Sequence, residues 1–229
     1  MANLLYLVHR MPYPPDKGDK VRSYHLLRHL AERHRVFLGT FADDPADLRH
    51  LSTLRQWCAG LHVAPMNPRA AKLRSLAGLA TGEPLSVRAW RNAGLRRWVR
   101  ETVANEGIEA GVVYSSAVAQ YADELRGRPL IVDFVDVDSA KWSAYAERHA
   151  WPLSWLYRRE GRTLLAYERA VAGASRRSFF STAQETELFL RHAPEAAPVC
   201  EAMTNGVDAE RFAPDPSLPK PFAAGQRAI

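Results

Sequence analysis

The chain has 229 residues, of which 47% are hydrophobic and 24% charged, a balance typical of a soluble globular protein. This composition excludes a disordered chain and a fibrous repeat, and no window reaches the ~18 consecutive apolar residues of a membrane span. The formal net charge is +6, but the segment between Arg69 and Glu101 holds eight basic and two acidic residues and accounts for the whole excess. The charge therefore indicates a local basic face and argues against a general affinity for nucleic acid.

The N-terminus and the cysteines indicate the compartment. Residues 1–10 carry no basic region ahead of their apolar run and no small-residue cleavage site, which argues against a secretory signal. Cys58 and Cys200 lie far apart without C-x-x-C spacing, so they predict neither a disulfide framework nor a zinc site. We expect a cytoplasmic protein.

Short apolar runs alternate with helical patterns along the whole chain. Helical spacing is expected near 19–33, 46–57, 69–105 and 152–172. The apolar runs predict strands at 4–8, 36–41, 61–64, 112–114, 130–134, 177–181 and 199–203. This alternation predicts an α/β fold: a Rossmann-like, doubly wound parallel sheet of about seven strands with helices on both faces.

A change of composition after Phe212 indicates a domain boundary. Four prolines and a glycine follow between residues 214 and 225. We expect residues 1–212 to form one domain and residues 213–229 to form a linker that leads to a second domain beyond Ile229.

In an open parallel sheet, ligands bind beyond the carboxyl ends of the strands, so the loops there are searched first. The first loop ends in Gly18, Asp19, Lys20 and Arg22. Gly18 allows close approach of a ligand to the backbone, and the helix start behind it suits phosphate or sugar oxygens. The same residues also fit a plain turn with Asp19 as helix cap.

The loop after the fifth strand carries three carboxylates, Asp133, Asp136 and Asp138, followed by Ser139. Carboxylates crowded in this way bind a cation, a polyol or neighbouring basic side chains. Asp136 is the catalytic candidate, and Asp138 and Ser139 are substrate-binding candidates. Alternatively, Asp138 or Ser139 caps the next helix. The carboxylates could also bind a divalent metal ion, but three acids on one loop without a histidine argue against a metal site.

Two hydroxyls, Ser115 and Ser116, follow the fourth strand and are further candidates for binding a polyol. They serve equally well as helix caps. A G-x-S-x-G motif is absent, which argues against a hydrolase nucleophile.

The basic segment contains an apolar stripe, in which Leu95 and Val99 recur at helical spacing. Such a helix fits an anionic membrane surface. The membrane-facing candidates are Trp90, Arg96, Arg97, Trp98 and Arg100. The alternative is an ordinary domain helix with its apolar side in the core.

Two motifs carry a family resemblance. The run from Gly18 through Arg22 and Leu30 resembles the first loop and helix of retaining GT-B glycosyltransferases, the family 4-like group that contains sucrose and phosphatidylinositol mannosyl transferases. Residues 205–208, Asn-Gly-Val-Asp, with Phe212 and Pro214 behind them, resemble the signature N-G-V-D-x-x-x-F-x-P, with Asn205 and Gly206 in a tight turn. The residues of the loops at 14–20 and 132–142 most resemble those of sugar transferases of exosortase and PEP-CTERM exopolysaccharide systems.

The resemblance implies an N-terminal, acceptor-side half of a hexosyl- or glycosyltransferase. Such an enzyme transfers sugar with retention from a nucleotide-sugar donor, without cofactor or obligatory metal, to a lipid-linked or polysaccharide acceptor. Asp136 stands near the position where many relatives have a histidine beside the reacting sugar. The donor site would lie in the second domain, so the isolated chain is expected not to turn over.

Two other functions remain open. One is a non-catalytic sugar- or nucleotide-binding domain. The other is a nucleic-acid-binding module, which the sequence pI of about 9.5 suggests but no recognised motif supports.

Overall fold

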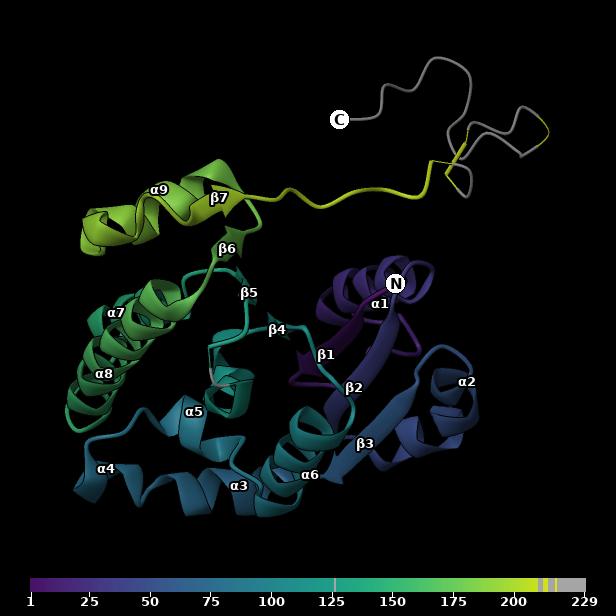
Figure 1. Ribbon diagram of the computed structural model, residues 1–229. Helices are drawn as coiled ribbons and strands as arrows, with labels where there is room; N and C mark the ends of the chain where they lie inside the picture. The colour runs from purple at the N-terminus through teal and green to yellow at the C-terminus, as the bar shows by residue number, and fades with distance from the viewer. Residues whose placement is uncertain (126, 210–211, 214–216, 218–229) are drawn as a thin grey trace.

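Seven parallel strands form one sheet in the order β3-β2-β1-β4-β5-β6-β7 (Figure 1). The computed structural model describes residues 1–125, 127–209, 212, 213 and 217. Each predicted strand is present, and the predicted Rossmann-like α/β fold is confirmed. The strands are β1 (Asn3–Val8), β2 (Arg35–Ala42), β3 (Gly60–Pro65), β4 (Ala110–Tyr114), β5 (Leu130–Val135), β6 (Arg177–Phe180) and β7 (Cys200–Ala202).

Both faces of the sheet are buried. In β1, Leu5 and Leu7 join one apolar cluster, whereas Tyr6 and Val8 join another. Because successive side chains of a strand point to opposite faces, these two clusters lie on the two sides of the sheet. A continuous apolar strand is the pattern expected when helices cover both faces.

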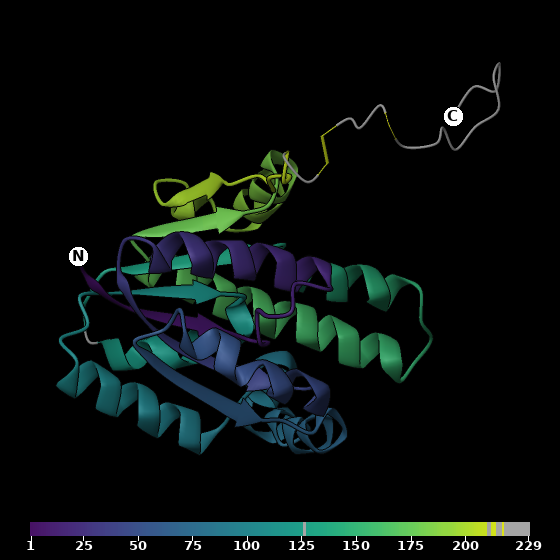
Figure 2. The same ribbon diagram turned by 90° about the vertical axis from the view of Figure 1, so that its right-hand side faces the viewer.

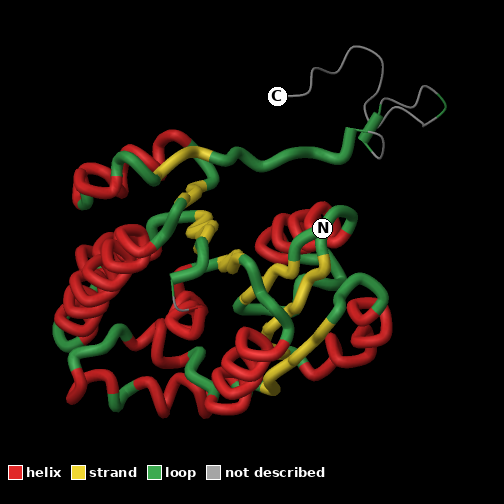
Figure 3. The backbone as a smooth tube through the Cα atoms, viewed as in Figure 1, coloured by secondary structure: helices red, strands yellow, loops and turns green. Residues whose placement is uncertain are grey.

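Helices cover each face (Figure 3). Leu27 and Leu54 bring α1 and α2 to the cluster that contains Tyr6. Residues of α6, η2, α8 and α9 join the cluster that contains Leu5. The helices are α1 (Gly18–Ala31), α2 (Leu51–Arg55), α3 (Pro68–Ser75), α4 (Gly78–Thr81), α5 (Leu85–Ala89), α6 (Ala93–Asn105), α7 (Asp138–Glu147), α8 (Leu153–Ala174) and α9 (Ala183–His192), with the 3₁₀ helices η1 (Pro45–His50), η2 (Ser116–Leu125) and η3 (Pro194–Ala196).

The helical region expected at 69–105 is present and is divided into four helices, α3 to α6; Gly82 in a left-handed conformation and Pro84 separate α4 from α5. One local expectation is wrong. Residues 203–208 are not a tight turn, and neither Asn205 nor Gly206 has a positive φ. The side chain of Asn205 instead accepts a hydrogen bond from Arg22 at 2.8 Å, which draws the segment after β7 toward α1 (Figure 1).

A glycine sets the packing of α7 against α8. A Cβ atom on Gly161 of α8 would lie 2.6 Å from Ser143 Oγ and 3.1 Å from the backbone oxygen of Ser139, both in α7. The two helices therefore approach at a distance that only glycine permits. Gly173, near the end of the same helix, has no atom within 4 Å of its missing Cβ.

These two glycines predict opposite effects of alanine. Gly161→Ala forces α7 and α8 apart and lowers the free energy of unfolding by about 1–3 kcal/mol. Gly173→Ala meets no neighbour and raises it by about 0.5–1 kcal/mol, because alanine loses less entropy in a helix. Urea unfolding followed by circular dichroism measures both, and equal effects of the two substitutions would contradict the packing.

Candidate active site at the carboxyl edge of the sheet

The start of α1 lies over the carboxyl ends of β1 and β4. Gly18 is exposed, and nothing lies within 4 Å of the position of its missing Cβ, so a ligand can approach this backbone. Lys17 occupies the N-cap position and its side chain makes no cap hydrogen bond. Asp19 is therefore not the cap, and its carboxylate is turned to other partners.

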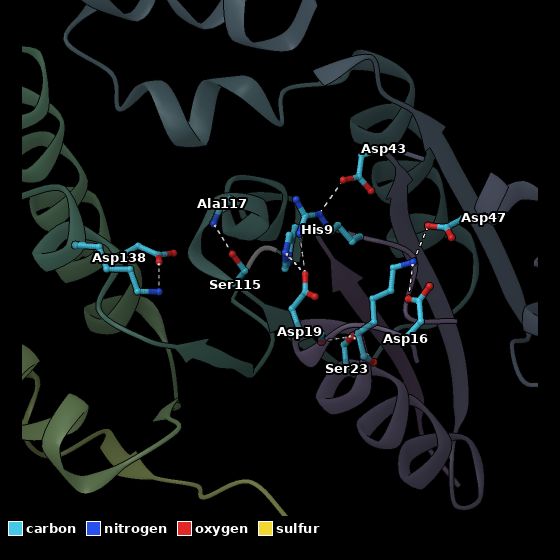
Figure 4. A network of polar contacts seen from close by, with 12 residues as sticks. His9, Asp16, Asp19, Ser23, Asp43, Asp47, Ser115, Ala117 and Asp138 are labelled. Carbon is cyan, nitrogen blue, oxygen red and sulfur yellow. Dashed lines mark hydrogen bonds and ion pairs between the residues drawn. The ribbon is translucent and has the colours of Figure 1, made fainter. Parts of the chain in front are cut away.

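Asp19 belongs to a polar network with His9, Arg10 and Asp43 (Figure 4). His9 directly follows β1, and its Nε2 lies 3.5 Å from Asp19 Oδ2. Arg10 Nη1 donates to Asp19 at 3.0 Å, and its Nε donates to Asp43 at 2.8 Å. Contact with His9 and then Arg10 holds the pKa of Asp19 well below its usual range, although burial opposes this. Asp19 is thus a carboxylate that orients an imidazole.

The His9 ring is held on two sides. It stacks on Tyr114 with 5.9 Å between ring centroids and meets Trp90 edge-on at 5.4 Å. Its side chain is 16% exposed, and its Nδ1 is buried without a hydrogen-bond partner among the described residues. A fixed imidazole beside a carboxylate can bind a hydroxyl group or transfer a proton.

His9 was not among the residues predicted from the sequence. A lone histidine with no spaced partner gives no motif, and Asp19 lies ten positions further on. The available signal was its place, since His9 is the first residue after a buried strand, at the edge where ligands bind in this fold.

The side chain of Lys20 is buried and paired with two aspartates. Its side chain is 1% exposed and its Nζ lies 2.8 Å from Asp47 and 3.4 Å from Asp16. Burial works against the charge, but the hydrogen bond and ion pair with Asp47, followed by Asp16, raise the pKa of Lys20. Its side chain fastens α1 to η1, so any contact of Lys20 with a ligand would come from its backbone.

Arg22 connects three parts of the fold. Its guanidinium donates to both carboxylate oxygens of Asp133, at 2.8 and 3.2 Å, and to Asn205 at 2.8 Å. Asp133 is 1% exposed at the end of β5. Burial raises the pKa of Asp133, and Arg22 opposes the rise. Residues from the two motifs noted in the sequence thus meet at one side chain.

The strand ends beside this pair are strained. Ser115 has a φ of 78° and Val135 a φ of 71°, values that L-residues rarely adopt. The amide of Ser115 donates to Asp133 O at 2.8 Å and that of Val135 to Asp133 Oδ1 at 3.2 Å. Ser115 and Ser116 are 9% and 3% exposed. Their role as substrate ligands stays a prediction.

The other acidic residues of this loop are paired with lysine. Lys141 Nζ lies 2.7 Å from Asp136 and 3.0 Å from Asp138, and Ser181 Oγ donates to Asp136 at 3.1 Å. Basic side chains were one of the three partners expected for crowded carboxylates, and Lys141 is such a partner. Asp136 remains 37% exposed and lies at the same edge as His9, and its catalytic role stays a prediction.

Ser139 lies in the interior. It is 3% exposed, and its Oγ donates at 2.6 Å to Glu168, which is 1% exposed on α8. In this structure the hydroxyl connects α7 to α8, and its role in binding a substrate stays a prediction. Neither Ser139 nor Asp138 caps α7, whose N-cap is Val137.

The apolar stripe of the helix for which a membrane contact was predicted packs into the core. Leu95 and Val99 are fully buried, and Trp90 and Trp98 pack against the same core. A Cβ atom on Gly39 of β2 would lie only 3.1 Å from the Trp98 ring, so α6 packs closely against β2.

Two of the three basic residues predicted to face a membrane are engaged in ion pairs. Arg96 and Arg100 pair with Glu124 at 3.2 and 3.1 Å, and Arg97 is exposed. The apolar side of α6 therefore lies in the core, as the alternative of an ordinary domain helix expects, and membrane contact through these side chains stays a prediction. None of the helices in the described part of the chain is long and apolar enough to cross a bilayer.

No family model and no curated protein matches the chain. Solved structures do. Anabaena Alr3699/HepE in complex with UDP and glucose superposes with a TM-score of 0.53 at 17% identity, covering 95% of this chain and 48% of that one. The N-terminal domain of Candida albicans trehalose-6-phosphate phosphatase gives a TM-score of 0.51 at 10% identity, covering 92% and 50%. The chain spans about half the length of these structures and shares their fold.

The Arg22–Asp133 pair predicts a large loss of stability when one partner is removed. Arg22→Met leaves a buried carboxylate without its counter-charge and lowers the free energy of unfolding by about 3–5 kcal/mol. Arg22→Met combined with Asp133→Asn recovers part of this loss. Urea unfolding measures both variants, with the exposed Arg162→Met as the control expected within about 0.5 kcal/mol of wild type. A double variant no better than the single one would show that the charge is not the cause.

Glu168 predicts a pH dependence. Burial raises its pKa to about 8, while the hydrogen bond from Ser139 opposes this, and an unfolded glutamate titrates near 4.3. The folded state therefore holds this proton more tightly. Its stabilisation is complete below about pH 4 and is lost as the pH rises through 8, on the order of 5 kcal/mol in all.

Urea unfolding from about pH 5 to 8 checks this pH dependence. Glu168→Gln should remove the decline in stability, whereas Glu187→Gln, an exposed glutamate on α9, should keep it. Parallel pH profiles for all three proteins would refute the shift.

Proposed function

We propose that the chain is the acceptor-side half of a glycosyltransferase that takes its sugar from a nucleotide-sugar donor. The observation that carries the proposal is the His9–Asp19 pair, which lies beneath an exposed helix start at the carboxyl edge of a Rossmann-like sheet. The shared fold with a protein that binds UDP and glucose supports it. Exposed amide groups at Gly18 suit phosphate or sugar oxygens, and the imidazole suits a sugar hydroxyl.

The finer parts of the proposal come from the resemblance of the sequence motifs. They are a hexosyl donor, transfer with retention, a role in exopolysaccharide biosynthesis, and an acceptor that is polysaccharide or lipid-linked. They also include a cytoplasmic location, with contact at the inner membrane surface when the acceptor is a lipid. Residues 1–212 would form the acceptor-side domain, and the predicted linker 213–229 lies mostly outside the described residues.

Within this proposal His9 contacts the substrate, and Asp19 positions the imidazole ring of His9. Asp19 keeps the ring in place through the 3.5 Å contact, and Arg10 in turn fixes Asp19. Asp136 lies further along the same edge, where Lys141 neutralises it. It would bind sugar hydroxyls through the oxygen lone pairs that its ion pair leaves free.

The test is an assay of sugar transfer from labelled nucleotide sugars, using the longest polypeptide that the reading frame encodes and a lipid extract as acceptor. His9→Gln is expected to lower kcat/KM by about 100-fold or more. The matched control is His25→Gln, which alters an exposed histidine on α1 and leaves the rate unchanged. Retention is read from the anomeric configuration of the product by NMR.

Two outcomes would overturn the proposal or one part of it. Nucleotide-sugar binding without transfer to any acceptor would indicate the non-catalytic sugar-binding domain instead. Equal rates for His9→Gln and His25→Gln would remove His9 from the site while leaving the reaction class intact.

A further inference from the structure

Large apolar side chains are exposed on two parts of the chain. Trp151 is 80% exposed at the turn between α7 and α8, and Leu73 is 71% exposed on α3. Single exposed apolar residues are ordinary, but a group of them marks an interaction surface. We call this group the apolar rim; it consists of Leu73, Leu76, Leu79, Trp151, Leu153 and Trp155.

Hydrogen bonds hold the two parts of the rim together. Arg159 of α8 donates to the carbonyl oxygens of Gly78, the first residue of α4, and of Glu83, in the loop between α4 and α5. The neighbouring Glu160 is 2% exposed and accepts from the first two amides of α5, each at 2.8 Å. Trp155 lies one turn before Arg159, so the two residues share a face of α8.

The rim lies toward the edge of the molecule that holds the candidate active site. The α7–α8 hairpin extends well beyond the arrowheads of the strands, and Trp151 is at its tip (Figure 2). The segment from α3 to α5 follows the carboxyl end of β3, as His9 follows that of β1. A surface that docks the rim would therefore face the same direction as His9.

The charge around the rim has one sign. Residues 68–81 and 148–158 contain no acidic side chain. Five basic side chains in these stretches are exposed and have no ion-pair partner among the described residues: Arg69, Lys72, Arg74, Arg148 and Arg158. By contrast, Arg96 and Arg100 of α6 are paired with Glu124.

We propose that the apolar rim docks onto an anionic lipid bilayer. Tryptophan prefers the boundary between headgroups and acyl chains, and unpaired basic residues beside it add attraction to anionic lipid. Each basic residue near such a surface strengthens binding about fivefold. The inference rests on the proposed function only for its purpose, which is to bring His9 to an acceptor held in the membrane.

The experiment is co-sedimentation of the full chain with vesicles of phosphatidylcholine, with and without phosphatidylglycerol, at low salt. Wild type binds the anionic vesicles and much less the neutral ones. Trp151→Ser with Trp155→Ser lowers the partition coefficient by about tenfold or more. Both side chains are exposed, so the thermal unfolding of this variant should match that of wild type.

Charge-matched variants complete the test. Lys72→Ser with Arg74→Ser weakens anionic binding by about 25-fold. Arg55→Ser with Arg176→Ser removes two exposed charges away from the rim and should retain most of the binding. Equal losses in the two pairs, or unchanged binding after loss of both tryptophans, would overturn the proposal.

Two other results would also overturn it. A dimer that the tryptophan variant dissolves, with no vesicle binding, would assign the rim to a second copy of the chain. Salt-sensitive binding to DNA that exceeds vesicle binding would assign its charges to nucleic acid. Because sedimentation needs no turnover, failure here is separate from failure of the sugar-transfer assay.

Discussion

The carboxyl edge of the sheet depends on one buried ion pair, between Arg22 and Asp133. A carboxylate that is 1% exposed cannot stay ionised without a partner, and Arg22 supplies that partner in bidentate geometry. The pair therefore fixes the first turns of α1 over the end of β5. The position of Asp19 beside His9 follows from this, because Asp19 lies one turn before Arg22 on the same helix.

Further ion pairs make this edge rigid before any ligand arrives. Lys20 fastens α1 to η1, and Arg10 connects α1 to the loop after β2 through Asp19 and Asp43. Buried and partly buried pairs contribute little net stability, but they select one arrangement over others. The surrounding ion pairs and hydrogen bonds also maintain the left-handed backbone at Ser115 and Val135. A site that is rigid in this way loses little conformational entropy when it binds a ligand.

The fold was predictable because its signals are local. A run such as Leu-Leu-Tyr-Leu-Val is apolar at every position only where both faces are covered, and this places strands without knowledge of their neighbours. The site was predictable only in part. The sequence indicated Arg22 and Asp133 in separate loops, but 111 positions separate them and no spacing rule pairs them. His9 carried no motif at all. The apolar stripe of α6 was ambiguous for a related reason, since periodicity reveals an apolar face but not what covers it.

The link between α8 and the α4–α5 segment has a geometric consequence. Helix α8 has 22 residues, so it is about 33 Å long, and Arg159 and Glu160 join its first third to α4 and α5. The rim is thus supported by the long helix α8 and by the α4–α5 segment that is hydrogen-bonded to it. Such a support sets both the height and the tilt of the sheet above whatever plane the rim rests on. The distance from that plane to His9 would then be a fixed dimension of the fold, and it would limit how far an acceptor must extend to be reached.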